Sequence, residues 1–184
     1  FVGFEVNEGE YKTMGLAPYG EAKYVSEIYK LLNVTEDGSF NLNLGYFAFH
    51  YSLKDVYTKK FEEIFGKHNT KGDRVVSYYA DIAASIQQVL EEMIITIANH
   101  VYEKTRQENL SFAGGVALNS VVNWKILSKT KFKKIYIQPA AGDSGGALGA
   151  ALWAYRTVLN KKNKFILDHA YWGEEQSDEE IESF

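Results

Sequence analysis

Two glycine-rich junctions constrain the fold of this chain more than any other feature of its 184 residues. The stretches LSFAGGVALNSVVNWKIL and IYIQPAAGDSGGALGAALWA share one plan: apolar residues, then glycines, then an apolar helical pattern. The first predicts a strand near 110–113 and a helix to about 128, and the second a strand at 135–138 and a helix at 145–159. Repeated strand–turn–helix units are typical of α/β proteins.

Both junctions are chemically suited to bind an anion. The first backbone N–H groups of a helix have no acceptor within the helix, and the helix dipole favours negative charge there. Because glycine has no Cβ, a phosphate can approach the backbone at two glycine pairs, Gly114-Gly115 and Gly145-Gly146. The amide of Asn119 can hydrogen-bond a ribose or a phosphate oxygen. The sequence therefore predicts a nucleotide site at these turns.

The second junction also contains a carboxylate, Asp143, followed by Ser144. A carboxylate beside phosphate-binding amides repels the phosphate unless a cation bridges the two. Asp143 is therefore predicted to bind a metal that also contacts phosphate oxygens, with Ser144 part of the nucleotide-binding turn.

Close packing of strand against helix is the alternative explanation for these glycines. A second junction that carries an aspartate favours nucleotide binding over packing. Neither junction matches G-x-G-x-x-G or G-x-x-x-x-G-K-[ST], so the dinucleotide and P-loop signatures are absent. A third candidate is EYKTMGLAPYG, read as an apolar approach to a loop, where Lys12 can neutralise phosphate and Gly15 and Gly20 allow close contact.

The longest predicted element is a helix at about 74–106, with apolar residues every three or four positions on one face, Ile86 among them. Tyr78, Tyr79 and Met93 fit core packing along this helix. The other predicted elements are helices at 21–32 and 54–65, a hairpin turn at Asp37-Gly38, strands on both sides of Gly45, and a last helix capped by Ser177 and Glu180.

Composition argues against several function classes. The formal net charge of −4 argues against a nucleic-acid partner. The absence of cysteine excludes disulfides and thiolate chemistry. The four histidines lack metal-ligand spacing, and no Ser-His-Asp arrangement is present. No apolar run is long enough to span a bilayer, so no membrane contact is expected.

Five blocks in order resemble the NodU/CmcH/TobZ family of O-carbamoyltransferases over nearly the whole chain: GFEVNEGEYKTMGLAPYG, DGSFNLNLGYFAFHY, DIAASIQQVLEE, NLSFAGGVALNSVVNWKIL and IYIQPAAGDSGGALGAALWA. The resemblance implies an α/β lobe of the actin-like ATPase (ASKHA, RNase H-like) superfamily, a mixed sheet flanked by helices with a long central helix. Residues 1–168 resemble the second half of an N-terminal Kae1-like domain. Residues 169–184 would be an acidic linker towards a C-terminal YrdC-like domain.

The resemblance also implies a reaction. The YrdC-like domain makes carbamoyl adenylate from carbamoyl phosphate and ATP. The Kae1-like domain then transfers the carbamoyl group to a hydroxyl of a sugar or antibiotic-like acceptor. The metal of the family, typically iron, is held by an H-x-x-x-H pair and an aspartate that Asp143 matches; Mg or Mn is an alternative. The implied nucleotide-binding residues are Gly114, Gly115, Val116 and Asn119, with Lys12, Gly15 and Gly20 in a closing loop.

The chain departs from the family pattern because it has no H-x-x-x-H pair and no YrdC-like domain. The isolated chain is therefore expected to be inactive and to contact both missing parts in the complete protein; no general base is identified. The alternatives are another ASKHA enzyme that uses ATP (a sugar kinase or a threonylcarbamoyl-transfer protein), a nucleotide-binding module without chemistry, and glycines that serve packing alone. Missing targeting signals and the need for ATP predict a cytoplasmic location.

Overall fold

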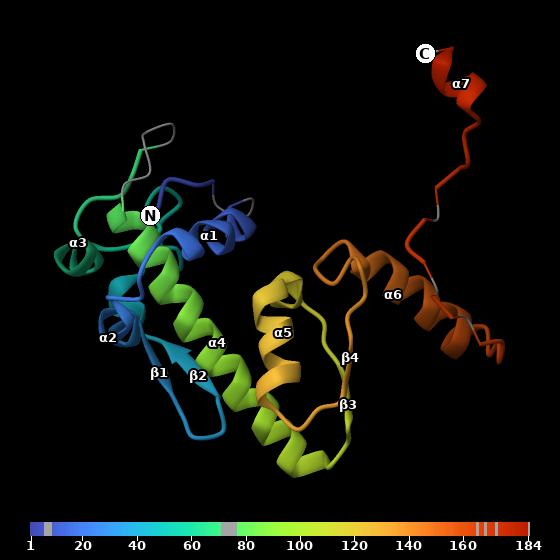
Figure 1. The fold of residues 1–184 in the computed structure, drawn as a ribbon, viewed down its shortest axis with the longest axis horizontal. Helices are drawn as coiled ribbons and strands as arrows, with labels where there is room; N and C mark the ends of the chain where they lie inside the picture. Colours follow the sequence, from blue (N-terminus) through green and yellow to red (C-terminus); the bar gives the residue numbers. More distant parts are fainter. Residues whose placement is uncertain (6–8, 71–76, 165, 168, 172, 184) are drawn as a thin grey trace.

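The computed structural model of the protein describes residues 1–5, 9–70, 77–164, 166–167, 169–171 and 173–183. Figure 1 shows the arrangement of its elements. In chain order they are α1 (Glu10–Leu16), α2 (Val25–Ile28), β1 (Leu32–Val34), β2 (Phe40–Leu42), α3 (Lys59–Phe65), α4 (Ser77–Thr105), β3 (Asn109–Ser111), α5 (Ser120–Lys129), β4 (Lys134–Tyr136), α6 (Gly145–Trp153) and α7 (Asp178–Glu182). Within the described ranges, no helix combines the length and the apolar character needed to cross a bilayer.

Helix α4 organises the molecule, as the long apolar pattern predicted. Its first half packs against α1, α2 and the residues before α1, and its second half packs against α5 (Figure 1). Two apolar clusters result, one around Phe65, Val89 and Met93, the other around Val122 and Ile126. Burying each such side chain contributes roughly 1.5–3 kcal/mol, so these clusters are the main stabilising feature.

The single apolar stripe predicted for α4 is only partly correct. Met93 is buried, and Tyr78 and Tyr79 pack against the first cluster, as expected. Ile86, however, is 38% exposed, whereas Asp81 and Glu91 are buried. The reason is that α4 has neighbours on more than one side, so burial is not confined to one face.

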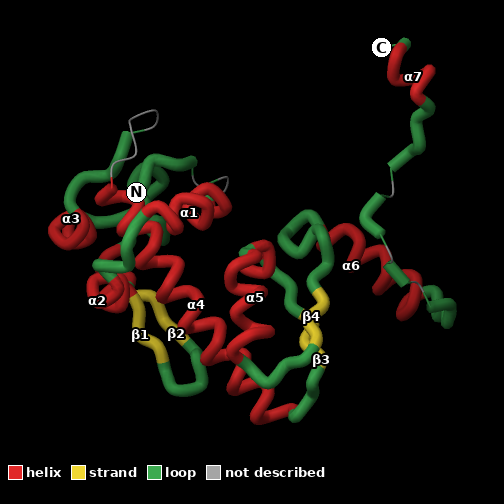
Figure 2. The backbone as a smooth tube through the Cα atoms, viewed as in Figure 1, coloured by secondary structure: helices red, strands yellow, loops and turns green. Residues whose placement is uncertain are grey.

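The described strands form two small sheets (Figure 2), and the mixed sheet of an actin-like lobe stays a prediction. β1 and β2 are antiparallel around the predicted turn, where Gly38 has a φ of 85° that favours glycine. Of the two strands expected around Gly45, the one before it is β2, which ends at Leu42. The one after it is not formed, because Leu44–Tyr46 is a 3₁₀ turn and Phe47 makes only an isolated bridge with Tyr57. β3 and β4 are parallel, with Leu110 opposite Ile135.

The loop expected within EYKTMGLAPYG is instead helical. Helix α1 continues into a 3₁₀ turn at Ala17–Tyr19, with Pro18 in its first positions, and both pack on α4. Proline is compatible with the start of such a turn because its missing N–H has no partner there in any case. Gly20 then lies directly against the α4 backbone, at Ala80 and Asp81.

Hydrogen bonds to α4 hold the segment that follows Gly20. The backbone N–H of Glu21 donates to Oδ1 of Asp81 (2.8 Å), and Nζ of Lys23 lies 2.9 Å from Oδ2. The backbone N–H of Tyr24 donates to the hydroxyl of Ser85 (2.9 Å). Asp81 is only 7% exposed, so its carboxylate needs these partners.

This arrangement predicts an acid-sensitive contribution to stability. The Glu21 N–H, and then Lys23, hold the pKa of Asp81 below its usual value of 3.8. Because the pKa of Asp81 is lower in the folded state than in the unfolded state, its ionised carboxylate stabilises the fold at pH values above the usual 3.8. This stabilisation is lost as the pH falls through the folded-state pKa. We expect the free energy of unfolding from urea titrations to fall more steeply below about pH 5 in the wild type than in Asp81→Asn. Asp178→Asn, on exposed α7, should keep the wild-type slope; equal slopes for the wild type and Asp81→Asn would contradict the prediction.

The C-terminal segment extends away from the body of the structure (Figure 1). Each described residue from 169 onwards is exposed. The predicted capping box is confirmed: the backbone N–H of Glu180 donates to the hydroxyl of Ser177 (3.2 Å), and the Ser177 N–H donates to Oε2 of Glu180 (2.8 Å).

Candidate nucleotide site at the two glycine turns

The two glycine turns lie side by side. β3 and β4 are parallel, so their carboxyl ends meet at one edge of the small sheet. The backbone N–H of Gly114 donates to the carbonyl of Ala141 (2.8 Å). A Cβ on Gly142 would lie 3.9 Å from Cα of Gly115. The turns that share a sequence plan therefore form one continuous surface.

The first turn is more elaborate than a direct strand-to-helix junction. Gly114 has a φ of 106°, which favours glycine, and a 3₁₀ turn at Gly115–Leu118 precedes α5. Apart from its chain neighbours, no described residue has an atom within 4 Å of a Cβ built on Gly115. Val116 is 40% exposed. The backbone at Gly115 is thus open to an approaching group.

The second turn contains glycines of two kinds. A Cβ on Gly145 would lie 2.1 Å from the carbonyl oxygen of Ala140, so close packing requires glycine there. A Cβ on Gly146 would meet no atom within 4 Å among the described residues outside its own stretch of helix. Close packing therefore accounts for Gly145, whereas nothing in the described packing requires glycine at Gly115 or Gly146.

Several backbone donors at this edge have no acceptor. The N–H groups of Gly115, Val116, Asp143 and Ser144 donate to no described residue. They belong to the two adjacent turns, each of which precedes a helix. Backbone N–H groups without an acceptor, at the starts of adjacent helices, are suited to bind an anion.

A cavity of about 480 Å³ adjoins the second turn and the start of α6. Its lining is largely apolar and includes Tyr136, Gln138, Gly142, Gly146, Leu148 and Leu152. Oε1 of Gln138 is buried and has no described hydrogen-bond partner. An apolar cavity beside a set of free N–H groups suits a ligand with a flat apolar part and an anionic part.

Asn119 occupies a different position from the one expected of a ligand. It is the N-cap of α5, and its Oδ1 accepts the backbone N–H of Val122 (3.1 Å). Its Nδ2 donates to Oε1 of Gln87 on α4 (2.9 Å). Both atoms of its amide are therefore engaged within the fold, and contact with a nucleotide stays a prediction.

The described residues do not by themselves form a metal site. Asp143 is exposed, and no group of three His, Cys, Asp or Glu side chains with suitable placement occurs among the described residues. A single carboxylate does not define a metal site. The assignment of Asp143 as a metal ligand therefore stays a prediction that needs ligands from elsewhere.

The third sequence candidate does not join this edge. No residue of α1 lines the cavity, and Nζ of Lys12 lies 5.6 Å from the ring centroid of its neighbour Tyr11. Figure 1 shows α1 beside the first half of α4, whereas α6 lies beyond α5. Gly15 has open space around a built Cβ, and Gly20 packs on α4. A closing movement that brings Lys12 to the nucleotide stays a prediction.

A polar network that the sequence patterns did not predict joins α4 to α5. Gln87 and Glu91 on α4 contact Asn119 and Lys125 of the α5 region. The apolar pattern of α4 predicts one buried face, and polar residues such as Gln87 and Glu91 are then expected to face solvent. The polar run QQVLEE on that helix is the only sequence signal for this network.

Comparison with known proteins places the chain in a family. Residues 1–152 match the family described as carbamoyltransferase N-terminus. The uncharacterized protein sll1178 of Synechocystis is 45% identical over 190 residues, which cover 100% of this chain and 31% of that protein. Nodulation protein NolNO of Sinorhizobium fredii is 34% identical over 89% of this chain and 23% of its own length. Nodulation protein NolO of Bradyrhizobium diazoefficiens is 31% identical, over 93% of this chain and 29% of its own length. The chain thus spans less than a third of the length of these relatives.

Proposed function

This chain belongs to the carbamoyltransferase N-terminus family, and from that premise we propose that the complete protein transfers a carbamoyl group from carbamoyl adenylate to a hydroxyl of a small-molecule acceptor. In this proposal the adenylate is made from carbamoyl phosphate and ATP, and the chain is one lobe of an actin-like fold. The observation that carries the proposal is the edge where the two glycine turns meet, with the free N–H groups of Gly115, Val116, Asp143 and Ser144 and the adjoining apolar cavity.

The phosphate of the adenylate is the group that this edge is suited to hold. The N–H groups of Gly115 and Val116 come from one turn, and those of Asp143 and Ser144 from the other. Donors held by a folded backbone stabilise negative charge without reorganising during the reaction. The apolar cavity beside Gly146 and Leu148 would accept the adenine ring.

Transfer is a displacement at the carbamoyl carbon. The acceptor hydroxyl oxygen forms a bond to that carbon, and the bond from the carbon to the phosphate oxygen breaks. AMP leaves with the electron pair, while the hydroxyl proton passes to a general base, to which no residue is assigned. The glycine edge would hold the AMP phosphate, orient the carbamoyl group and help to exclude water, which would otherwise hydrolyse the mixed anhydride. ATP is thus the proposed cosubstrate, and any divalent metal would need ligands in addition to Asp143.

Hydrogen–deuterium exchange of the complete protein with and without AMP tests this site directly. We expect AMP to slow exchange in peptides that cover 113–119 and 140–146, because the free N–H groups then donate to phosphate. Peptides from α3 serve as an internal control and should exchange equally in both conditions. Binding of AMP with no protection at either turn would contradict the proposed site.

A further inference from the structure

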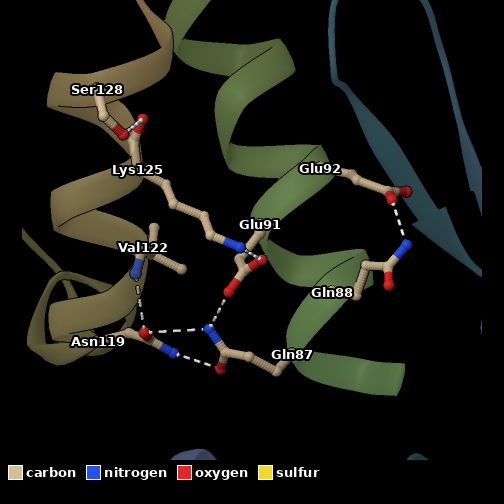
Figure 3. A network of polar contacts seen from close by, with 8 residues as sticks. All are labelled: Gln87, Gln88, Glu91, Glu92, Asn119, Val122, Lys125 and Ser128. Carbon is tan, nitrogen blue, oxygen red and sulfur yellow. Dashed lines mark hydrogen bonds and ion pairs between the residues drawn. The ribbon is translucent and has the colours of Figure 1, made fainter. Parts of the chain in front are cut away.

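A network of hydrogen bonds and one ion pair connects α4 to the first glycine turn and to α5 (Figure 3). Nε2 of Gln87 donates to Oδ1 of Asn119 (3.3 Å), and Nδ2 of Asn119 donates back to Oε1 of Gln87 (2.9 Å). Nε2 of Gln87 also donates to Oε1 of Glu91 (3.0 Å). Oε2 of Glu91 accepts a hydrogen bond from Lys125 in an ion pair. Gln87 thus connects Asn119 to the rest of the network.

The two hydrogen bonds between the side-chain amides of Gln87 and Asn119 fix the Asn119 end of the glycine turn. At the other end, the Gly114 N–H is bonded to the carbonyl of Ala141. Between these two anchors lie Gly115 and Val116, whose N–H groups are free. A segment held at both ends keeps its backbone donors in place, which an anion site requires.

Burial strengthens the role of Gln87. Glu91 is only 7% exposed, and the side chains of Gln87 and Asn119 are part-buried. Loss of a partner in such a place leaves donors and acceptors unsatisfied, which costs more than loss of an exposed hydrogen bond. Asn119 must keep Oδ1 near the Val122 N–H, and the reciprocal bond from Gln87 selects the orientation of the amide that does so.

We infer that Gln87 is a positioning residue for the nucleotide site: through Asn119 it holds the Gly114–Asn119 turn in the conformation that binds phosphate. Asn119 then acts on binding by the same route, as a held cap and not as a ligand. The part of this inference that concerns binding rests on the proposed function, whereas the part that concerns the order of the turn does not.

The adjacent residue offers a matched control. Gln88 lies on the same turn of α4 and donates to Oε1 of Glu92 (2.8 Å) in an exposed contact that does not reach α5 (Figure 3). Methionine has a similar length to glutamine and keeps the helix, so Gln87→Met and Gln88→Met remove equivalent amides from different networks. Only the first loses the contact to Asn119.

Hydrogen–deuterium exchange of the complete protein and both variants tests the inference. Without nucleotide, Gln87→Met should exchange about tenfold faster in peptides covering 113–122, since both hydrogen bonds between Gln87 and Asn119 are lost, with no change in peptides from α3. With AMP, it should need about tenfold more ligand for half-maximal protection of the same peptides. Gln88→Met should match the wild type in both measurements.

The other outcomes separate the two hypotheses. Wild-type exchange at 113–122 in Gln87→Met would overturn the positioning role, and so would faster exchange spread evenly through α3 and α4, which indicates general destabilisation. A third outcome combines two results: Gln87→Met exchanges faster only at 113–122, and AMP gives the wild-type turns no protection. The first result would support the positioning of the turn by Gln87, and the second would refute the nucleotide site.

Discussion

Replacement of Gly20 with alanine is expected to destabilise the fold by about 3 kcal/mol or more. A Cβ at this position would lie 2.1 Å from the carbonyl carbon and 2.2 Å from the carbonyl oxygen of Ala80, and 2.4 Å from the backbone nitrogen of Asp81. These atoms belong to the central helix and cannot rotate away as a side chain can. Relief of the clash would move the segment from Gly20 to Tyr24 and break its hydrogen bonds to Asp81 and Ser85.

Urea unfolding followed by circular dichroism measures this effect. Gly15→Ala is a matched control, because Gly15 lies in helix α1 and has open space around a built Cβ. Alanine is favoured over glycine in a helix by roughly 0.8–1 kcal/mol, so this variant should be equally or more stable than the wild type. If Gly20→Ala unfolded at the wild-type urea concentration, the close packing of Gly20 on α4 would be refuted.

Gly115→Ala, in contrast to Gly20→Ala, should greatly reduce the affinity for AMP and change the free energy of unfolding little. Gly115 does not have the positive φ of Gly114, and no atom lies within 4 Å of a built Cβ. The free energy of unfolding should therefore change by only about 0.5 kcal/mol. The added methyl group would stand where a phosphate must approach the free N–H groups. We expect AMP affinity at this edge to fall about 100-fold, or about 2.7 kcal/mol.

Titration of AMP against exchange protection at 113–119 would measure that loss. Gly173→Ala, in the exposed C-terminal segment with no atom within 4 Å of a built Cβ, should bind AMP like the wild type. A folded Gly115→Ala protein with unchanged affinity would show that no phosphate approaches this backbone, and packing would then be the better explanation for the glycine pair.

Local patterns in the sequence predicted the elements whose signals are contained in a few neighbouring residues. The strand–glycine–helix units around Gly114 and Gly145, the hairpin turn at Gly38 and the capping box at Ser177 are of this kind. The exact boundaries differ by a few residues, as fraying ends and a 3₁₀ turn before α5 explain.

Contacts between distant segments could not be predicted in this way. Gly20 is predicted to allow close contact with a nucleotide, and that contact stays a prediction. Nothing in its neighbouring residues indicates that it also packs against α4, about 60 residues later in the chain. The amide pair of Gln87 and Asn119 joins residues 32 positions apart, and neither residue type indicates the other. Both contacts arise from how helices pack, which periodicity alone does not specify.

The central claim is that the complete protein activates and transfers a carbamoyl group, and pyrophosphate release tests it most directly. The complete protein would be incubated with ATP, with and without carbamoyl phosphate, and pyrophosphate measured over time. Our account predicts that release requires carbamoyl phosphate, because formation of carbamoyl adenylate releases pyrophosphate from ATP and needs carbamoyl phosphate as the second substrate. A folded protein that binds ATP but releases no pyrophosphate when carbamoyl phosphate is present would contradict it.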